Sequence, residues 1–143
     1  MSKILHLQKL SVGTENVGDL AAWQSQKRAQ APDGRPRHIT RMRPKRIDEV
    51  LGGGSMYWVV KGSILCRQVI HRFEEYDRGD GIRRCAIVLE PDLIRVVPTL
   101  KRPFQGWRYL KPEDAPRDLP KGRDSEEPLP PALNAALAEI GVL

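Results

Sequence analysis

The sequence predicts an α+β fold in which a mostly antiparallel sheet curls into a small, partly closed β-barrel. The strongest observation is the stretch 56–97, where runs such as YWVVKG and SILCRQVIHRF are rich in β-branched and aromatic residues. Helical periodicity, by contrast, occurs only in short segments before and after this stretch. A length of 143 residues with 40% hydrophobic side chains suits a single core.

The chain opens with a predicted strand and a predicted helix. Loose alternation of apolar and polar residues over 4–12 indicates the strand. The segment 16–31 is expected to form the helix, which Pro-Asp-Gly at 32–34 ends. The positions with helical spacing are Val17, Leu20, Ala21 and Gln24. Trp23 is expected to pack on the sheet beside Leu20.

A glycine triplet at 52–54 ends the second predicted helix. A short strand over 37–42 precedes this helix, which is expected over 44–51. Pro44 suits its first turn because the missing N–H has no helical partner there. We interpret the glycines as a plain loop or as a place where the backbone closely approaches a ligand. They are not a P-loop, because the lysine of that motif is missing.

Five or six strands are expected in total, and most belong to the second half of the domain. The segments Leu65–Tyr76 and Ile82–Leu89 should pair as a hairpin around the turn DRGDG. Leu93–Val97 is the last predicted strand, closed by Pro98.

The character of the chain changes after this region. Residues 1–116 are expected to form one domain, and the proline-rich, charged segment 117–128 is expected to form an extended linker. Leu133, Leu137 and Ile140 then predict a short amphipathic helix over 129–143. This helix would dock on the domain or bind another chain.

Charge is segregated along the chain. The net charge is +6, and between Lys27 and Arg46 there are eight Lys or Arg against one acid, Asp33. Between Arg95 and Lys111 there are five cations and no acid. If the two basic segments meet in the fold, they form a basic face that favours anionic partners such as nucleic acid.

Metal and membrane roles are disfavoured. Cys66 and Cys85 lie in strand-like runs and are expected to be buried, reduced thiols. These cysteines and three scattered histidines lack zinc-site spacing, so no metal and no cofactor is expected. No apolar run reaches the roughly 18 residues of a membrane helix, and no secretory signal is visible, so we expect a cytoplasmic protein without a membrane partner.

The segment KRPFQGWRYLKP, residues 101–112, interleaves aromatic and cationic side chains without any acid. Such a pattern suits single-stranded nucleic acid, because rings stack on bases while Lys and Arg neutralise phosphates. The alternative is structural, with Phe104 and Trp107 plugging the open end of a barrel. The segments RMRPKR (41–46) and YWVVKG (57–62) are further candidates, with a solvated helix start and a buried Trp58 as their plain alternatives.

The motifs GGGSMYWVVKGSILCRQVI, DGIRRCAIVLEPDLI and RPFQGWRYLKPEDAP, in this order, resemble a family of small bacterial proteins known only as a domain of unknown function. The segments LHLQKLSVG and RMRPKRIDEVLGGGS fit the same family, so the resemblance covers residues 4–119. It implies no activity. The curled sheet followed by a basic, aromatic segment is also similar to the PUA-like superfamily (PUA, ASCH and EVE domains). That similarity implies a small barrel that binds RNA or modified bases.

These observations favour a non-enzymatic RNA-binding or other nucleic-acid-binding module with a basic, aromatic-lined groove. The candidate binding residues are Arg41, Arg43, Lys45, Arg46, Tyr57, Lys61, Arg67, Arg102, Phe104, Gln105, Trp107, Arg108 and Tyr109. One alternative is a protein-interaction subunit that uses 129–143 to bind a partner or a second copy. Another is a small-ligand or modified-nucleoside pocket lined by Tyr57, Trp107 and Arg108. No nucleophile–base signature is evident, so no catalytic residue is expected.

Overall fold

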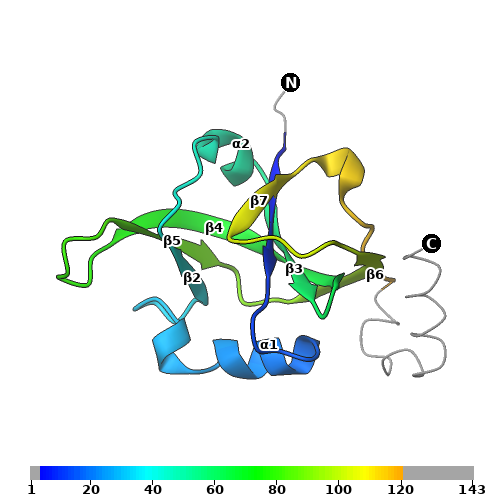
Figure 1. Ribbon diagram of the computed structural model, residues 1–143, viewed down its shortest axis with the longest axis horizontal. Helices are drawn as coiled ribbons and strands as arrows, with labels where there is room; N and C mark the ends of the chain where they lie inside the picture. Colours follow the sequence, from blue (N-terminus) through cyan, green and yellow to red (C-terminus); the bar gives the residue numbers. More distant parts are fainter. Residues whose placement is uncertain (1–3, 121–143) are drawn as a thin grey trace.

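The structure, a computed structural model, describes residues 4–120, and within them one seven-stranded sheet dominates (Figure 1). The strands are β1 (His6–Leu10), β2 (Arg37–Thr40), β3 (Ser55–Val60), β4 (Ser63–Tyr76), β5 (Arg84–Leu89), β6 (Ile94–Leu100) and β7 (Trp107–Leu110). The helices of this part of the chain are α1 (Val17–Gln24), α2 (Ile47–Leu51) and the 3-10 helices η1 (Lys27–Ala29) and η2 (Pro112–Asp114).

The long strand β4 makes the sheet curl. Its first half lies between β3 and β6, and its second half pairs with β5, so one strand serves two differently oriented parts of the sheet. The strand order is β2-β5-β4-β3-β1-β7, with β6 beside β4. The pairs are antiparallel except for β1 with β3, and the ladder is irregular between Ile70 and Arg72. The prediction of a curled, mostly antiparallel sheet is therefore confirmed.

Two hairpins follow from local sequence. The expected pairing across DRGDG is confirmed as the β4–β5 hairpin, which extends away from the rest of the molecule in Figure 1. Between β3 and β4, Lys61 (φ 50°) and Gly62 (φ 84°) form a two-residue turn. Positive φ at both positions is the geometry that matches the twist of paired strands.

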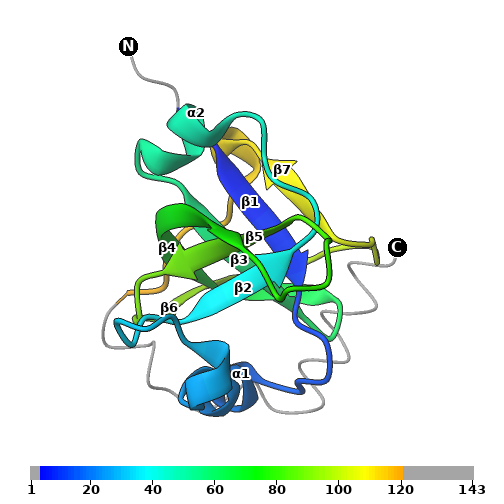
Figure 2. The same cartoon turned by 90° about the vertical axis from the view of Figure 1, so that its left-hand side faces the viewer.

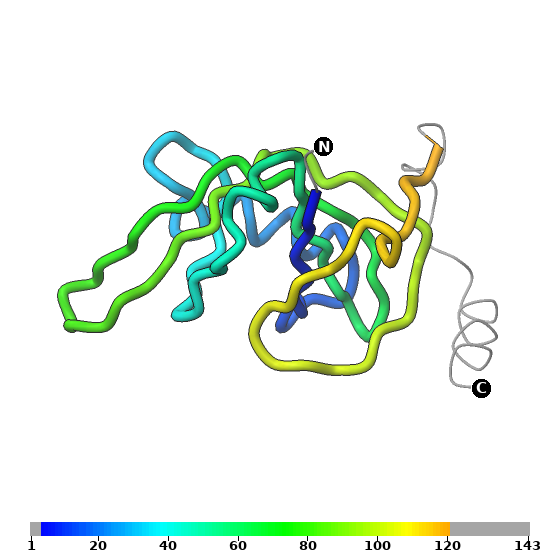
Figure 3. The backbone as a smooth tube through the Cα atoms, turned by 90° about the horizontal axis from the view of Figure 1, so that it is seen from above, coloured from blue at the N-terminus to red at the C-terminus, as the bar shows by residue number. Residues whose placement is uncertain are grey.

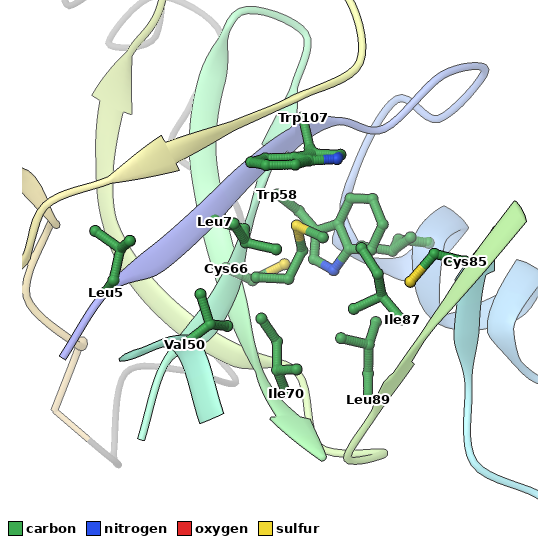
Figure 4. Packing of buried hydrophobic residues seen from close by; sticks show 12 residues of the cluster. Leu5, Leu7, Val50, Trp58, Cys66, Ile70, Cys85, Ile87, Leu89 and Trp107 are labelled. Atoms are coloured by element: carbon green, nitrogen blue, oxygen red, sulfur yellow. The ribbon is translucent and has the colours of Figure 1, made fainter. Parts of the chain in front are cut away.

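Hydrophobic side chains gather in two clusters on opposite faces of the sheet. Neighbouring residues of β3 point to opposite faces, so Trp58 joins the larger cluster and Tyr57 the smaller one. The larger cluster, drawn in Figure 4, contains Leu5, Leu7, Leu20, Val50, Met56, Trp58, Cys66, Ile70, Cys85, Ile87, Leu89 and Trp107. The smaller one contains Tyr57, Val59, Ile64, Val96 and Leu110.

The first helix is shorter than predicted, and its tryptophan faces outward. Helix α1 ends at Gln24 instead of continuing to residue 31, and Ser25 forms its C-cap. Leu20 and Gln24, one turn apart, are the buried positions, so Trp23 lies about 100° away around the helix and is 43% exposed. The Arg28 guanidinium lies 4.8 Å from the Trp23 ring centroid. The expectation that Trp23 packs on the sheet beside Leu20 was wrong.

Three further elements differ from the prediction. Strand β6 continues through Pro98 to Leu100 instead of ending at Val97. Helix α2 begins at Ile47, and Pro44 lies buried in the segment before it. The strand β7 was not predicted as a strand, yet Trp107–Leu110 pairs along β1. Figure 3 shows the wide turn between β6 and β7 that returns the chain to β1.

The chain continues to contact the sheet after η2. Arg117 O accepts a hydrogen bond from Val97 N at 2.8 Å, and Leu119 N donates to Arg95 O at 2.9 Å. The predicted helix over 129–143, and the linker residues after 120, lie outside the described residues. Within residues 4–120, no helix has the length and apolarity needed to cross a membrane.

Candidate functional site

The fold brings the two basic segments together. We call residues 41–46, which join β2 to α2, the basic arm, and residues 101–111 the basic turn. In Figure 2 the basic arm passes beside β7. Gly106 of the basic turn lies close enough to Met42 that a Cβ there would be 3.6 Å from the Met42 methyl carbon. The two segments therefore border one continuous surface.

Trp107 attaches the arm to the sheet. Its indole Nε1 donates to the Met42 carbonyl oxygen at 2.6 Å. The residue is only 7% exposed, and its ring lies over Trp58 and Leu7 in Figure 4. A ring in this position fills the end of the larger hydrophobic cluster. Its faces are therefore covered by protein and are not open to a base.

Tyr109 makes a second attachment. Its ring meets Trp107 edge to face at 4.9 Å, and its hydroxyl oxygen accepts the backbone N–H groups of Lys45 (3.0 Å) and Arg46 (3.1 Å). The Arg46 guanidinium lies 5.7 Å from the Tyr109 ring centroid. Backbone N–H groups of the arm are thus fixed from β7, which holds the side chains of the arm outward.

The cations of these segments face solvent. The exposed members are Arg41, Arg43, Lys45, Arg46, Arg102, Arg108 and Lys111. Within residues 4–120, Arg46 is the one among them that forms an ion pair, with Glu49 of α2. That pairing raises the pKa of Arg46. The other members form no ion pair within residues 4–120, unlike Arg84, which pairs with Asp80 in the β4–β5 hairpin.

Phe104 and Gln105 lie on the outer part of the basic turn. Phe104 is half-buried against the smaller hydrophobic cluster, and the Arg108 guanidinium lies 5.6 Å from its ring centroid. Gln105 is exposed. The Phe104 ring thus packs against the sheet and is also approached by a cation.

Three candidates, Lys61, Tyr57 and Arg67, are not part of the basic arm or the basic turn. Lys61 is in the β3–β4 turn and pairs with Glu15 at 3.0 Å. Tyr57 is opposite Arg67 in the β3–β4 register and is buried, with its ring 5.0 Å from that of His6. Arg67 holds Asp118 through two nitrogens, each at 2.8 Å. Tyr57 and Arg67 line a second pocket together with Asp118, and Lys61 is not among its lining residues. We therefore take the basic arm and the basic turn as the candidate site.

A separate cavity of about 440 Å³ lies beside α1, and none of its lining residues was a candidate binding residue in the sequence. Lys9, His38 and Trp58 are among them, and the rings of His38 and Trp58 meet edge to face at 6.1 Å. Burial lowers the pKa of Lys9, and burial together with the Lys9 charge lowers the pKa of His38 to about 4. The one feature of the sequence that could have indicated this cavity is Lys9, a lysine within the alternating first strand. The meeting of Lys9 with His38 depends on the curl of the sheet.

The cysteines offer no reactive thiolate. Both are free and buried, as expected. Burial raises the pKa of Cys66 to about 12 and also raises that of Cys85. Thiols with raised pKa values are poor nucleophiles near neutral pH. Among residues 4–120, no group of three or more His, Cys, Asp or Glu side chains could hold a metal ion.

Comparison with known proteins gives a family and no activity. The family model described as "Protein of unknown function (DUF1489)" matches residues 7–143. No curated protein and no solved structure matches the chain.

Proposed function

We propose that this chain, which belongs to the DUF1489 family of proteins of unknown function, is an RNA-binding module that contacts phosphates through the basic arm and the basic turn. The observation that carries the proposal is the pair of hydrogen bonds from Lys45 N and Arg46 N to the Tyr109 hydroxyl. They hold two basic segments, more than 60 positions apart in sequence, at one surface. Exposed cations without local acidic partners attract a phosphate backbone and release its counterions on binding.

The proposal differs from the sequence-based expectation in one respect. Trp107 is buried and Phe104 is half-buried, so base stacking on these rings contributes little. Binding is then dominated by backbone charge, which positions an RNA without reading its sequence. Gln105, exposed between the cations, is the group best suited to contact a base edge. The similarity to the RNA-binding PUA-like superfamily and a cytoplasmic location belong to the same proposal.

Binding to a single-stranded RNA, measured across a salt series, tests the proposal. The triple variant Arg41→Gln/Arg43→Gln/Lys45→Gln should lower affinity, and the negative slope of log K against log salt should become shallower by about 2, or roughly 0.7 per phosphate contact removed from a single strand. The matched control, Lys27→Gln/Arg78→Gln/Arg83→Gln, removes the same charge from exposed positions outside both segments.

Equal losses in the two triple variants would show that net charge, and not this surface, governs binding. An absence of RNA binding by the wild type at low salt would reject the function itself. The protein-interaction alternative rests on 129–143, outside the described residues, and deletion of 121–143 separates it, because RNA binding through the arm should survive that deletion.

A further inference from the structure

The cavity beside α1 plays no part in the proposed RNA binding. It has a volume of about 440 Å³ and lies between α1, the end of β1, the loop after it and the start of β2. Helix α1 is the lowest element in Figure 1, on the side of the sheet away from α2. Cavities that hold small ligands commonly measure about 300–1,000 Å³, so this one suits a molecule with one or two rings.

A network of buried amides keeps the cavity open by fixing α1 at a set distance from the sheet. Gln24 of α1 and Gln68 of β4 exchange hydrogen bonds at 2.8 and 2.7 Å. Gln68 Oε1 also accepts from Trp58 Nε1 at 2.8 Å, and Gln68 Nε2 donates to Glu90 O at 3.0 Å. Because these buried polar groups satisfy one another, the indole of Trp58 is held in one orientation in the wall of the cavity.

Lys9 gives the cavity a positive charge without a partner carboxylate. Its ammonium donates to the Leu10 carbonyl oxygen at 3.3 Å, and within residues 4–120 it forms no ion pair. Asp19 also lines the cavity, but its carboxylate accepts the Glu15 N–H at 2.9 Å. A half-buried cation that has lost water and gained no anion is stabilised when an anion enters.

His38 supplies polar groups next to this charge. Neither ring nitrogen has a hydrogen-bond partner among residues 4–120, and the ring meets Trp58 edge to face. In its neutral form, which its lowered pKa favours at pH 7, imidazole offers one donor and one acceptor. The charged and titratable groups around His38 at the cavity are Lys9, Asp19 and Arg37, and the Arg37 guanidinium stacks on Tyr76 instead.

We propose that this cavity binds a small aromatic or heteroaromatic anion, with its carboxylate or phosphate at Lys9 and its ring beside His38. Trp23, which lines the cavity and is 43% exposed, borders the opening. The inference does not depend on RNA binding, because none of the residues of the basic arm or the basic turn lines the cavity.

Titration calorimetry with 5′-AMP, indole-3-acetate and inorganic phosphate tests this site. Saturable binding of a ring-bearing anion is expected, with at least tenfold weaker binding in Lys9→Gln and unchanged binding in Lys27→Gln, whose exposed side chain lies outside the cavity. Preference for 5′-AMP assigns a phosphate to the site, and preference for indole-3-acetate assigns a carboxylate. Binding of neither, or equal binding by both variants, overturns the proposal.

A second measurement uses only the wild-type protein. An anion beside Lys9 favours the charged imidazolium, so the bound anion should raise the pKa of His38, followed by NMR of its ring protons. By linkage, affinity for indole-3-acetate, whose carboxylate stays ionised over this range, should increase as pH falls from 7 towards 5. A His38 titration that a saturating anion leaves unchanged would place the ligand outside this cavity.

Discussion

Among the glycines of residues 4–120, Gly54 has the least room for a side chain. A Cβ at this position would lie 2.2 Å from the Leu5 carbonyl oxygen and 2.6 Å from that of Val50. Both are backbone atoms, and Gly54 N donates a hydrogen bond to Val50 O at 2.7 Å. Moving either oxygen away would therefore disturb the backbone at a cost in stability. The close approach considered for the glycine triplet is therefore an approach of the chain to itself, where α2 enters β3.

Gly54→Ala should therefore lower the free energy of unfolding by about 3 kcal/mol or more, because the added methyl group forces β1 and α2 apart. Urea unfolding followed by circular dichroism measures this. Gly52→Ala is the matched control, since a Cβ there meets its nearest atoms at 3.5 Å and its φ of −74° suits alanine. A Gly54→Ala variant as stable as Gly52→Ala would show that the local packing is looser than described.

At the scale of elements, hydrogen bonds to side chains of β7 hold the basic arm in place. The arm lies between β2 and α2 and carries a buried proline, Pro44. Its polar attachments to β7 are the Tyr109 hydroxyl and the Trp107 indole. Since β2 and β7 are the two ends of the main strand order, these bonds also connect opposite ends of the curled sheet.

Tyr109→Phe removes the hydroxyl acceptor and keeps the aromatic ring that packs against Trp107. The backbone N–H groups of Lys45 and Arg46 then lose their partner, which should cost about 1–2 kcal/mol and accelerate hydrogen exchange at these two amides. Tyr76→Phe is the control, because Tyr76 contacts cations through its ring and its hydroxyl has no hydrogen-bond partner among residues 4–120. Unchanged exchange at Lys45 and Arg46 in Tyr109→Phe would mean that other contacts order the arm.

Local patterns predicted the elements whose partners are close in sequence. The β4–β5 hairpin is of this kind, because turn residues and strand runs specify it together. Strand β7 has four residues, and its partner β1 lies about a hundred positions earlier, so its pairing depends on the whole fold. The same holds for Trp107, whose burial follows from the curl of the sheet and not from its neighbours in sequence.

At the scale of the whole molecule, the curled sheet places the cations of the basic arm and the polar residues of the cavity on two separate sides. The basic arm and β7 lie above the middle of the sheet in Figure 1, and α1 with its cavity lies below it. Charge segregation in the sequence predicted the first side, because its cations lie in two short runs. The second side combines Lys9, His38 and Trp58 from three strands, a grouping that only the sheet order creates.

The burial of His38 near Lys9 makes the stability of the fold depend on pH. The pKa of His38 is about 4 in the folded protein, against 6.5 for an ordinary histidine. Between these values the unfolded chain binds a proton that the folded chain excludes, so stability is fully present above pH 6.5 and decreases as pH falls towards 4. The decrease amounts to at most about 3 kcal/mol. His6, whose pKa burial also lowers, adds a contribution of the same sign.

Urea unfolding at pH 7.0 and pH 4.5 measures this decrease, and His38→Gln should reduce it by removing the proton that the unfolded chain would bind. The comparison of the two pH values within each variant cancels any direct cost of the substitution. The ion pair of Asp80 with Arg84 contributes little to the difference between pH 7.0 and pH 4.5. Arg84 lowers the pKa of Asp80 to about 2, so this pair loses its stabilising effect only below about pH 4. An equal decrease in His38→Gln and wild type would mean that His38 already takes up its proton in the folded state, and the cavity would then be more open to water than its lining residues indicate.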